Sequence, residues 1–492
     1  MVTTPATKVA ARKARLTTLF LFCLTISTVT AHPEPNAEAA SFTNQEKGAR
    51  QILIYEDGNP YNYCEAEHPT VDTYPDPPVK GATLSNVQMF IRHGDRTSQS
   101  FYPVDHKVTY ECSAQTDYNY FTSAPNGSNA SLITTQVVTI PQDSPYAKSI
   151  WKGSCIPGQL TPKGAEQQER MGRALRRIYV DKLGFLPEKF QPEKFFVRST
   201  DFWRTRQSAT SLINGLYTTP SSSGATPPPA LRLTTLPFEL EYLVFNERDQ
   251  CPRVNQLKSI IARKSPLLQH LYTHIPAPII SACKIIDYPN TVSVDEVSDF
   301  VSPRVCHDLP MPCVKEGEEC VDGMGVMEAM AVFRSKETGE MLRDSEGSFE
   351  LLKVGFGPAV EMVRRNVIGG NARKEGGEGV VFSLYSGHDT MLMPLLAVLE
   401  SLDLRWPPYA SNILIEQWET PSSEKYIRVI YNNRIVRTKS NWCDLSWCPV
   451  QTFLDRLEKY LPGDDYLETC QEQPKRKPKN SILPPYMSDV RK

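Results

Sequence analysis

The stretch LSNVQMFIRHGDR at residues 84–96 decides the fold, because it joins an apolar run to a charged loop. Residues 84–91 are mostly apolar, which predicts a strand buried in a sheet. The loop that follows begins with Arg92 and His93 and contains Arg96 three residues later. A buried strand that ends in such a loop is typical of α/β proteins, whose ligands bind beyond the carboxyl ends of the strands.

Two later segments repeat this arrangement. Apolar runs near 194–197 and 380–385 predict further strands, and each is followed by polar residues. The first is followed by Arg198 and the second by His388 and Asp389. If the three strands are parallel neighbours, their carboxyl ends lie at one edge of the sheet. The sequence then predicts that the three loops meet in one crevice.

Helical patterns accompany these strands. Thr161 and Pro162 form a good helix start, because threonine can cap the first turn and proline suits the first helical position. This helix is predicted to reach about Tyr179. Further segments follow in chain order: helices at 202–217 and 391–402, then a closing pair of strands at 412–418 and 426–431. We therefore predict an α/β fold with a mostly parallel sheet core flanked by helices.

The length of 492 residues is enough for a large core with an insertion. The mid-chain carries two or three helical segments, which predicts a largely helical cap inserted in the chain. We expect these parts: a signal peptide or anchor at 1–31, an N-terminal wrapping segment at 32–83, an α/β core at 84–219 and 371–470, a mostly helical cap at 220–370 and a disordered tail at 471–492.

The N-terminus is typical of the secretory pathway. A charge-free segment at 16–30 follows a basic stretch, and Ala31 completes a run of small residues suited to cleavage. The alternative is an uncleaved type II anchor of the Golgi kind, although the segment is shorter than the roughly 20 residues that a spanning helix needs. Asn126 and Asn129 stand in Asn-X-Ser sequons that predict a glycoprotein. We expect a secreted or lumenal protein.

Twelve cysteines agree with an oxidising compartment. Cys23 lies in the leader, and the odd number that follows it leaves at least one cysteine outside an intrachain disulfide. Cys306, Cys313 and Cys320, together with His307, could alternatively be read as a zinc cluster, but their spacing fits no zinc template well. Disulfides are the better interpretation, and their pairing stays open.

The three loops would bring together three guanidiniums, two imidazoles and one carboxylate. Arg92, Arg96 and Arg198 would repel one another without an anion between them, and a tetrahedral phosphate suits their paired donors. His93 could attack phosphorus through a neutral ring nitrogen, and Asp389 could protonate the departing alkoxide. The arginines and the second imidazole would stabilise charge on the transferring oxygens. We expect neither a metal nor a cofactor, because the cations are built in.

Neighbouring polar residues have simpler interpretations. Arg204 is expected to be mainly structural, bracing its loop, and Asp201 is expected to cap the following helix. Asp95 is expected to fix the first loop. Tyr409 and Trp418 are most simply residues of the core.

These motifs resemble those of a known protein family. The segments RHGDR at 92–96 and RSTDFWRT at 198–205, with the later His388-Asp389 pair, resemble the histidine acid phosphatase family, branch 2 of the histidine phosphatase superfamily. The segment GQLTPKG at 158–164 is also similar to the family, and the likeness extends over residues 84 to 450 in the family's motif order.

The resemblance implies an acid phosphatase that hydrolyses phosphomonoesters to inorganic phosphate and an alcohol. It implies that His93 becomes the phosphohistidine and that Asp389 is the acid, so activity should favour acidic pH. It also implies a phosphate pocket formed by Arg92, Arg96, Arg198 and His388. One alternative is a catalytically inactive, secreted anion-binding protein of the same fold. Another is a phosphoglycerate-mutase-like phosphotransferase, which a signal peptide and disulfides disfavour.

Three departures bear on the subfamily. Ser98 stands where the family often has proline, and Met391 stands where phytases tend to have asparagine, which argues against phytate. The cysteine layout and length are similar to the 2-phosphoxylose phosphatase subfamily of the Golgi, but Arg198 matches general acid phosphatases better. The expected partner is a sugar, lipid or other organic phosphate. A net charge of -2 gives no argument for nucleic acid, a membrane contact is expected only through the N-terminus, and the sequence sets no oligomeric state.

Overall fold

The computed structural model describes most of the chain between residues 60 and 471. The described ranges are 60–102, 104–112, 150–217, 232–245, 251–286, 294–314, 319–369 and 377–471, with a few shorter pieces between them. The leader, the two sequons and the tail from residue 472 lie outside the described residues. None of the described helices is both long and apolar enough to cross a membrane.

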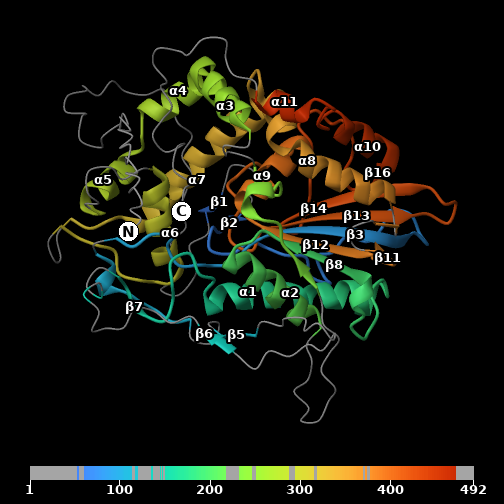
Figure 1. The fold of residues 1–492 in the computed structure, drawn as a ribbon, viewed down its shortest axis with the longest axis horizontal. Coiled ribbons are helices and arrows are strands. Elements are labelled where there is room, and N and C mark those ends of the chain that lie inside the picture. Colours follow the sequence, from blue (N-terminus) through green and yellow to red (C-terminus); the bar gives the residue numbers. More distant parts are fainter. Residues whose placement is uncertain are drawn as a thin grey trace, which may run out of the picture.

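An eight-stranded mixed sheet forms the centre of the molecule (Figure 1). Across the sheet the strands are β15 (Arg434–Ile435), β14 (Lys425–Tyr431), β13 (Asn412–Glu419), β3 (Thr83–Arg92), β12 (Phe382–Gly387), β8 (Phe195–Ser199) and β9 (Leu233–Thr234), with β16 (Cys448–Pro449) beside β14. The central strands β3, β12, β8 and β9 are parallel, and β13 and β14 are antiparallel. The predicted α/β fold with a mostly parallel core is confirmed.

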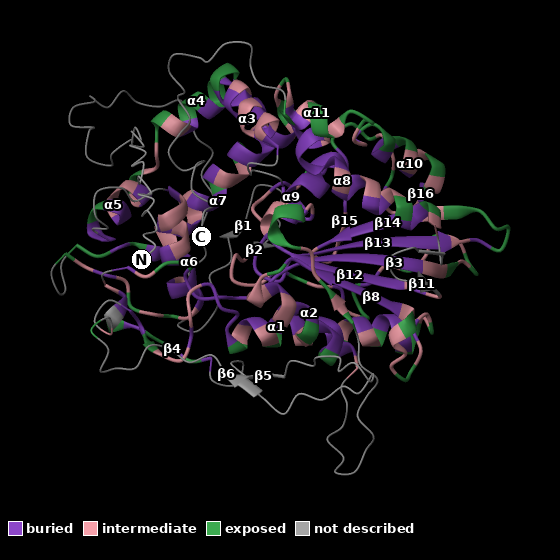
Figure 2. Cartoon of the chain, viewed as in Figure 1, coloured by how far each residue is buried: buried purple, intermediate pink, exposed green. Residues whose placement is uncertain are grey.

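Helices cover both faces of this sheet (Figure 1). Helices α1 (Pro162–Arg176) and α2 (Trp203–Leu216) lie on one face, and α8 (Ser348–Gly369), α9 (Asp389–Val398) and α10 (Val450–Glu458) lie on the other. The side chains of Val87, Met89 and Ile91 join the first layer, and that of Phe90 joins the second. Burial on both faces explains why consecutive residues 89–91 of β3 are all apolar, and Figure 2 shows the sheet almost wholly buried.

The start of α1 holds the loop that follows β3. As predicted, Pro162 is the first helical residue, and the Thr161 hydroxyl accepts a hydrogen bond of 3.1 Å from the Gly164 amide. A Cβ on Gly94 would lie 2.2 Å from the Gly164 carbonyl oxygen, so the two backbones are in direct contact. Glycine at both positions lets the charged loop pack against the helix without a gap.

A mostly helical body stands at one end of the sheet (Figure 1). Its helices are α3 (Pro252–Lys264), α4 (Pro266–Thr273), α5 (Ala277–Ile286), α6 (Val294–Cys306) and α7 (Gly323–Gly339). Helix α8 lies within the range assigned to the cap but packs on the sheet, where the Asn366 amide donates a 2.6 Å hydrogen bond to the Tyr385 hydroxyl. Residues 348–369 are therefore part of the core layers.

Ten of the eleven cysteines beyond residue 31 form five disulfides: Cys64–Cys306, Cys112–Cys155, Cys251–Cys470, Cys313–Cys320 and Cys443–Cys448. The eleventh, Cys283, is buried in the cap. The disulfide interpretation of the mid-chain cysteines therefore holds, and the zinc alternative does not. The bond from Cys64 to Cys306 joins the N-terminal segment to cap helix α6 and closes a long loop, which restricts the unfolded chain.

Candidate active site

His93 is the first residue beyond β3, and its side chain is almost fully buried. Its amide donates a 3.0 Å hydrogen bond to the Gly387 carbonyl, and its own carbonyl accepts one of 3.1 Å from Ala410. Nδ1 lies 2.8 Å from the Gly94 carbonyl oxygen. Because a carbonyl oxygen only accepts, Nδ1 carries the hydrogen, and Nε2 keeps its lone pair. That nitrogen is the nucleophilic atom of the ring.

The surroundings of His93 keep the ring neutral. Burial lowers the pKa of His93 well below 6.5, and the nearby charges of Arg204 and Arg92 lower it further. A protonated imidazole has no lone pair with which to attack phosphorus. The site therefore preserves the nucleophile in acidic solution.

We expect the formation of a phosphoenzyme to persist as the pH falls from 7 to 5. An imidazole with an ordinary pKa of about 6.5 would be about 97% protonated at pH 5 and would react roughly 30-fold more slowly. Because burial lowers its pKa well below 6.5, His93 stays neutral to a lower pH, so the rate should fall by clearly less than that factor. Rapid-quench measurement with a radiolabelled phosphomonoester at constant ionic strength checks this. A tenfold loss for each pH unit below 6.5 would contradict it.

His388 and Asp389 lie beside His93, as the sequence predicted. Gly387 pairs with Arg92 across the sheet, so the next residues on the two strands are neighbours. The rings of His93 and His388 are 5.5 Å apart between centroids. Asp389 begins α9, where its Oδ1 accepts a 2.9 Å hydrogen bond from the Thr390 amide and its Oδ2 lies 2.8 Å from Arg92 Nη2. The carboxylate is thus held in one orientation at the site.

Three guanidiniums surround this pair. Arg92 bonds to Asp389, and Arg96 Nη1 lies 2.7 Å from the carboxylate of Asp299, which belongs to cap helix α6. Within the described part of the chain, the Nε atoms of Arg92, Arg96 and Arg204 are buried and have no hydrogen-bond partner. Buried cationic donors without an acceptor are costly. An anion with several oxygens, such as a phosphoryl group, would satisfy them.

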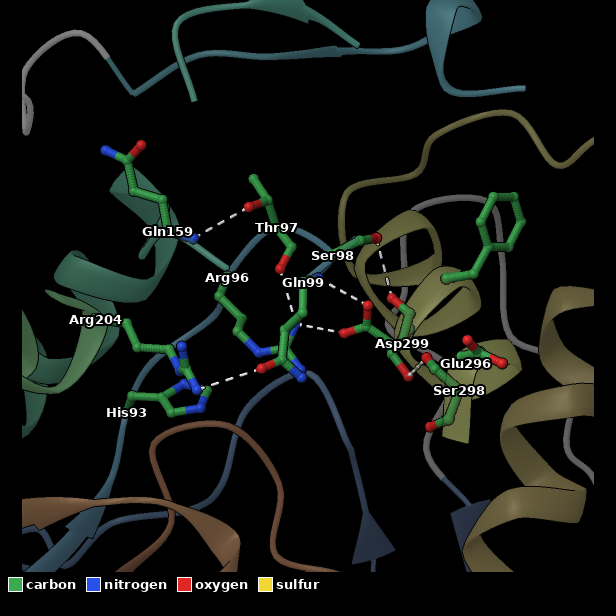
Figure 3. A network of polar contacts seen from close by, with 12 residues as sticks. His93, Arg96, Thr97, Ser98, Gln99, Gln159, Arg204, Glu296, Ser298 and Asp299 are labelled. Carbon is green, nitrogen blue, oxygen red and sulfur yellow. Dashed lines mark hydrogen bonds and ion pairs between the residues drawn. The ribbon is translucent and has the colours of Figure 1, made fainter. Parts of the chain in front are cut away.

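Arg204, expected from the sequence to be mainly structural, also belongs to this group of cations. It lies in the first turn of α2, close to His93 and within 3.5 Å of the Gln99 side-chain oxygen (Figure 3). Burial and the neighbouring charge of Arg96 lower the pKa of Arg204 to about 9. The guanidinium is thus buried near another cation. The available signal in the sequence was its place near the end of the RSTDFWRT motif, at the second residue of the helix.

Arg198 lies apart from this cluster. It pairs across the sheet with Tyr385, which pairs with Phe90, so it is three residues, or about 10 Å, below the level of His93. Its Nη2 lies 2.7 Å from Glu241 Oε1 in a buried ion pair. We expected a turn to begin at Arg198, but β8 continues through Ser199. The guanidinium therefore stays inside the sheet layer, and Thr200 is the residue that contacts His388, at 3.1 Å.

Buried contacts around His93 hold the loop in place and line the site. Asp95 is fully buried, and its Oδ1 accepts a 2.5 Å hydrogen bond from Thr161 and lies 2.5 Å from His307 Nε2. This confirms that Asp95 braces the loop. Tyr409 is buried, as expected of a core residue, but its ring centroid is 5.8 Å from that of His93 and 4.7 Å from the Arg92 guanidinium. It is therefore also a wall of the site.

Comparisons with known proteins agree with this geometry. The family model described as histidine phosphatase superfamily (branch 2) matches residues 83–276 and 347–432. Counting factor 60 of Dictyostelium discoideum is 25% identical over 417 residues, covering 83% of this chain and 92% of the relative. Human lysophosphatidic acid phosphatase type 6 is 24% identical (79% and 86% covered), and human 2-phosphoxylose phosphatase 1 is 23% identical (79% and 82% covered).

Solved structures show the same fold. The Hafnia alvei phytase superposes with a TM-score of 0.52 at 13% identity, covering 80% of this chain and 99% of that one. The Citrobacter braakii phytase gives a TM-score of 0.50 at 15% identity, covering 77% and 98%.

The chain belongs to branch 2 of the histidine phosphatase superfamily. Within that class it is a phosphoric monoester hydrolase, an acid phosphatase.

Proposed function

We propose that the enzyme works through a phosphohistidine formed on His93. Nε2 of His93 attacks phosphorus, the bond from phosphorus to the ester oxygen breaks, and Asp389 gives its proton to the departing alkoxide. Water then attacks the phosphohistidine, returns a proton to Asp389 and releases inorganic phosphate. The observation that carries this proposal is the neutral, buried His93 ring beside Asp389 inside a group of arginines.

The phosphate pocket in this proposal is formed by Arg92, Arg96, Arg204 and His388. Arg204 takes the place that the sequence interpretation gave to Arg198, because Arg204 acts on His93 and Arg198 is engaged by Glu241. The cations would stabilise charge on the transferring oxygens. The alternative of an inactive binding protein is not favoured, since a binder need not keep a neutral nucleophile beside a proton donor.

The substrate class is inferred from similarity to two named relatives. Two relatives are named for a lysophospholipid phosphate and a phosphorylated sugar. We infer that this enzyme takes an organic phosphomonoester of the lipid or sugar kind. Comparing turnover of a lysophosphatidic acid and a phosphorylated monosaccharide by the purified protein would decide between them.

The function is tested by expressing the full chain in a secretory host and assaying an aryl phosphate from pH 4 to 8 with chelator present. We expect turnover that is greatest at acidic pH and unaffected by chelator. Phosphate binding without turnover would instead support the inactive binder. Loss of activity with chelator would point to a metal enzyme.

Asp389→Asn should slow alkyl phosphates far more than aryl phosphates. An alkoxide is a poor leaving group that needs the proton, whereas a nitrophenolate leaves without it. We expect kcat to fall about 10²- to 10³-fold with an alkyl phosphate and tenfold or less with p-nitrophenyl phosphate. Steady-state kinetics with both substrates gives the ratio. Equal losses would exclude Asp389 as the acid, and Asp403→Asn, a carboxylate bound to Arg405 by a local ion pair, is the control.

We also propose that the chain enters the secretory pathway through a cleaved signal peptide, with a Golgi anchor as the alternative. Five disulfides support an oxidising compartment. N-terminal sequencing of the mature protein should begin near His32 if the signal is cleaved. An intact leader in a membrane fraction would favour the anchor.

A further inference from the structure

Cap helix α6 runs along the segment that follows the catalytic loop. The Tyr102 hydroxyl donates a 3.2 Å hydrogen bond to the Glu296 carbonyl, and Arg304 Nη2 lies 2.5 Å from Asp105 in an ion pair that is almost wholly buried. Asp299 lies between these two contacts on the helix. All three residues contact the segment at 96–105, so this side of α6 faces the core. This face of the cap is therefore fixed to the core at several points.

Asp299 contacts three consecutive parts of the catalytic loop (Figure 3). Its Oδ1 accepts a 2.7 Å hydrogen bond from Arg96 Nη1, and its Oδ2 accepts one of 2.7 Å from the Gln99 amide. Its backbone carbonyl accepts a 3.0 Å hydrogen bond from the Ser98 hydroxyl. The carboxylate is only 11% exposed, so water screens these contacts little. One cap residue thus holds both the guanidinium and the backbone of the loop.

We propose that Asp299 is a positioning residue for catalysis, through which the cap sets the place of Arg96 at the phosphate site. The inference rests on the proposed role of Arg96 as a phosphate ligand. Anchoring Nη1 on Asp299 leaves Nε, which has no partner among the described residues, for the phosphoryl group. A donor fixed before the reaction stabilises developing charge without paying for reorganisation.

The composition of the loop explains why such a brace is needed. Position 98 is serine, which lacks the fixed φ angle of proline. Instead, Ser98 is fully buried, bonds to Asp299 through its hydroxyl and accepts a 2.7 Å hydrogen bond from the Gly158 amide through its carbonyl. Contacts from the cap and from the segment before α1 thus supply the restraint from both sides.

The carboxylate of Asp299 also offsets part of the positive charge of the arginines at the site. It is the carboxylate beside Arg96, and Arg96 in turn repels Arg204. Removing the negative charge would make the pocket more cationic, which favours binding of a phosphate dianion, while the freed guanidinium would lose its fixed position. The added positive charge acts on substrate binding, where it offsets the lost contact, so the affinity for substrate should change little. The loss of the fixed guanidinium acts on the chemical step, which should slow.

The test compares Asp299→Asn with Asp295→Asn in the full-length protein. Asp295 lies one turn earlier on α6 and pairs with Arg334 of α7, so its loss removes the same charge from the same helix without touching Arg96. We expect Asp299→Asn to lower kcat by about 10- to 100-fold with KM within threefold of the wild type. Asp295→Asn should keep kcat within twofold.

A second measurement separates this proposal from the proposed function. Vanadate resembles the phosphoryl group in transfer, whereas phosphate resembles the product, and binding of both can be followed by calorimetry without turnover. Asp299→Asn should weaken vanadate binding by the same factor as kcat and change the affinity for phosphate less than threefold in either direction. Equal effects of the two substitutions on vanadate, or equal losses of vanadate and phosphate affinity, would overturn the positioning role even if the wild type proved inactive.

Discussion

Replacing His93 with alanine is expected to remove phosphatase activity, with kcat falling on the order of 10⁴-fold or more. The substitution deletes the atom that forms the covalent intermediate, and the arginines alone cannot supply another nucleophile. Because His93 is buried, its truncation leaves a small cavity, which should lower the melting temperature by a few degrees without unfolding the protein. Activity on p-nitrophenyl phosphate, measured beside the melting temperature, checks both statements.

Trapping of the phosphoenzyme tests directly whether His93 is the nucleophile. Wild-type protein quenched during turnover of a radiolabelled substrate should carry label that acid releases, and His93→Ala should carry none. His274→Ala is the control, because this histidine is exposed just after the end of α4 and contacts Thr273 and His270 in its own segment. Label retained by His93→Ala would assign the nucleophile to another residue.

The buried state of His93 has a further consequence for stability. Its lowered pKa means that the unfolded chain binds a proton more readily than the folded one. This residue therefore makes the fold less stable as the pH falls from about 6.5 toward the folded pKa. Phosphate, which binds only the folded state, would offset the loss.

Local sequence patterns were sufficient for the core. The strand β3, the helix start at Thr161 and the closing pair β13 and β14 each follow from apolar periodicity or capping chemistry within a few residues. The meeting of His93 with His388 and Asp389 could also be predicted, because parallel neighbouring strands bring their loops to one edge.

Arg198 shows where local sequence patterns fail to predict the end of a strand. A polar residue after an apolar run predicts a turn, but Arg198 continues its strand because Glu241, 43 residues away, neutralises it inside the layer. Likewise, nothing near Arg96 in the sequence indicates Asp299, about 200 residues later. Partners that satisfy buried charges are chosen by the tertiary fold, and single-sequence periodicity carries no information about them.

The second large effect is expected from two arginine substitutions. Arg204→Met should lose activity, whereas Arg198→Met should lose stability. Arg204→Met removes a cation that would face the phosphoryl group, so kcat/KM should fall about 10³-fold. Its melting temperature should hardly change, because the substitution also relieves repulsion from Arg96. Enzyme kinetics and thermal unfolding on the two variants measure both effects.

Arg198→Met should instead destabilise the fold. Arg198 and Glu241 are both almost fully buried, so removal of the arginine leaves a carboxylate without its cation, at a cost of about 3–5 kcal/mol in the free energy of unfolding. Burial already raises the pKa of Glu241, and without Arg198 the carboxyl should protonate more readily, so the loss should be smaller at acidic pH. The double variant Arg198→Met/Glu241→Gln should recover much of the stability.

The activity of folded Arg198→Met decides between the two arginines. Assayed well below its melting temperature, it should keep kcat/KM within tenfold of the wild type, since its backbone lies three residues, or about 10 Å, below the level of His93 and Glu241 holds its guanidinium. If that folded variant were inactive while Arg204→Met turned over normally, the pocket would need Arg198 to move toward the substrate. A movement of that size would have to break the ion pair with Glu241. Glu241→Gln would remove that cost, so the variant should bind substrate more tightly than the wild type.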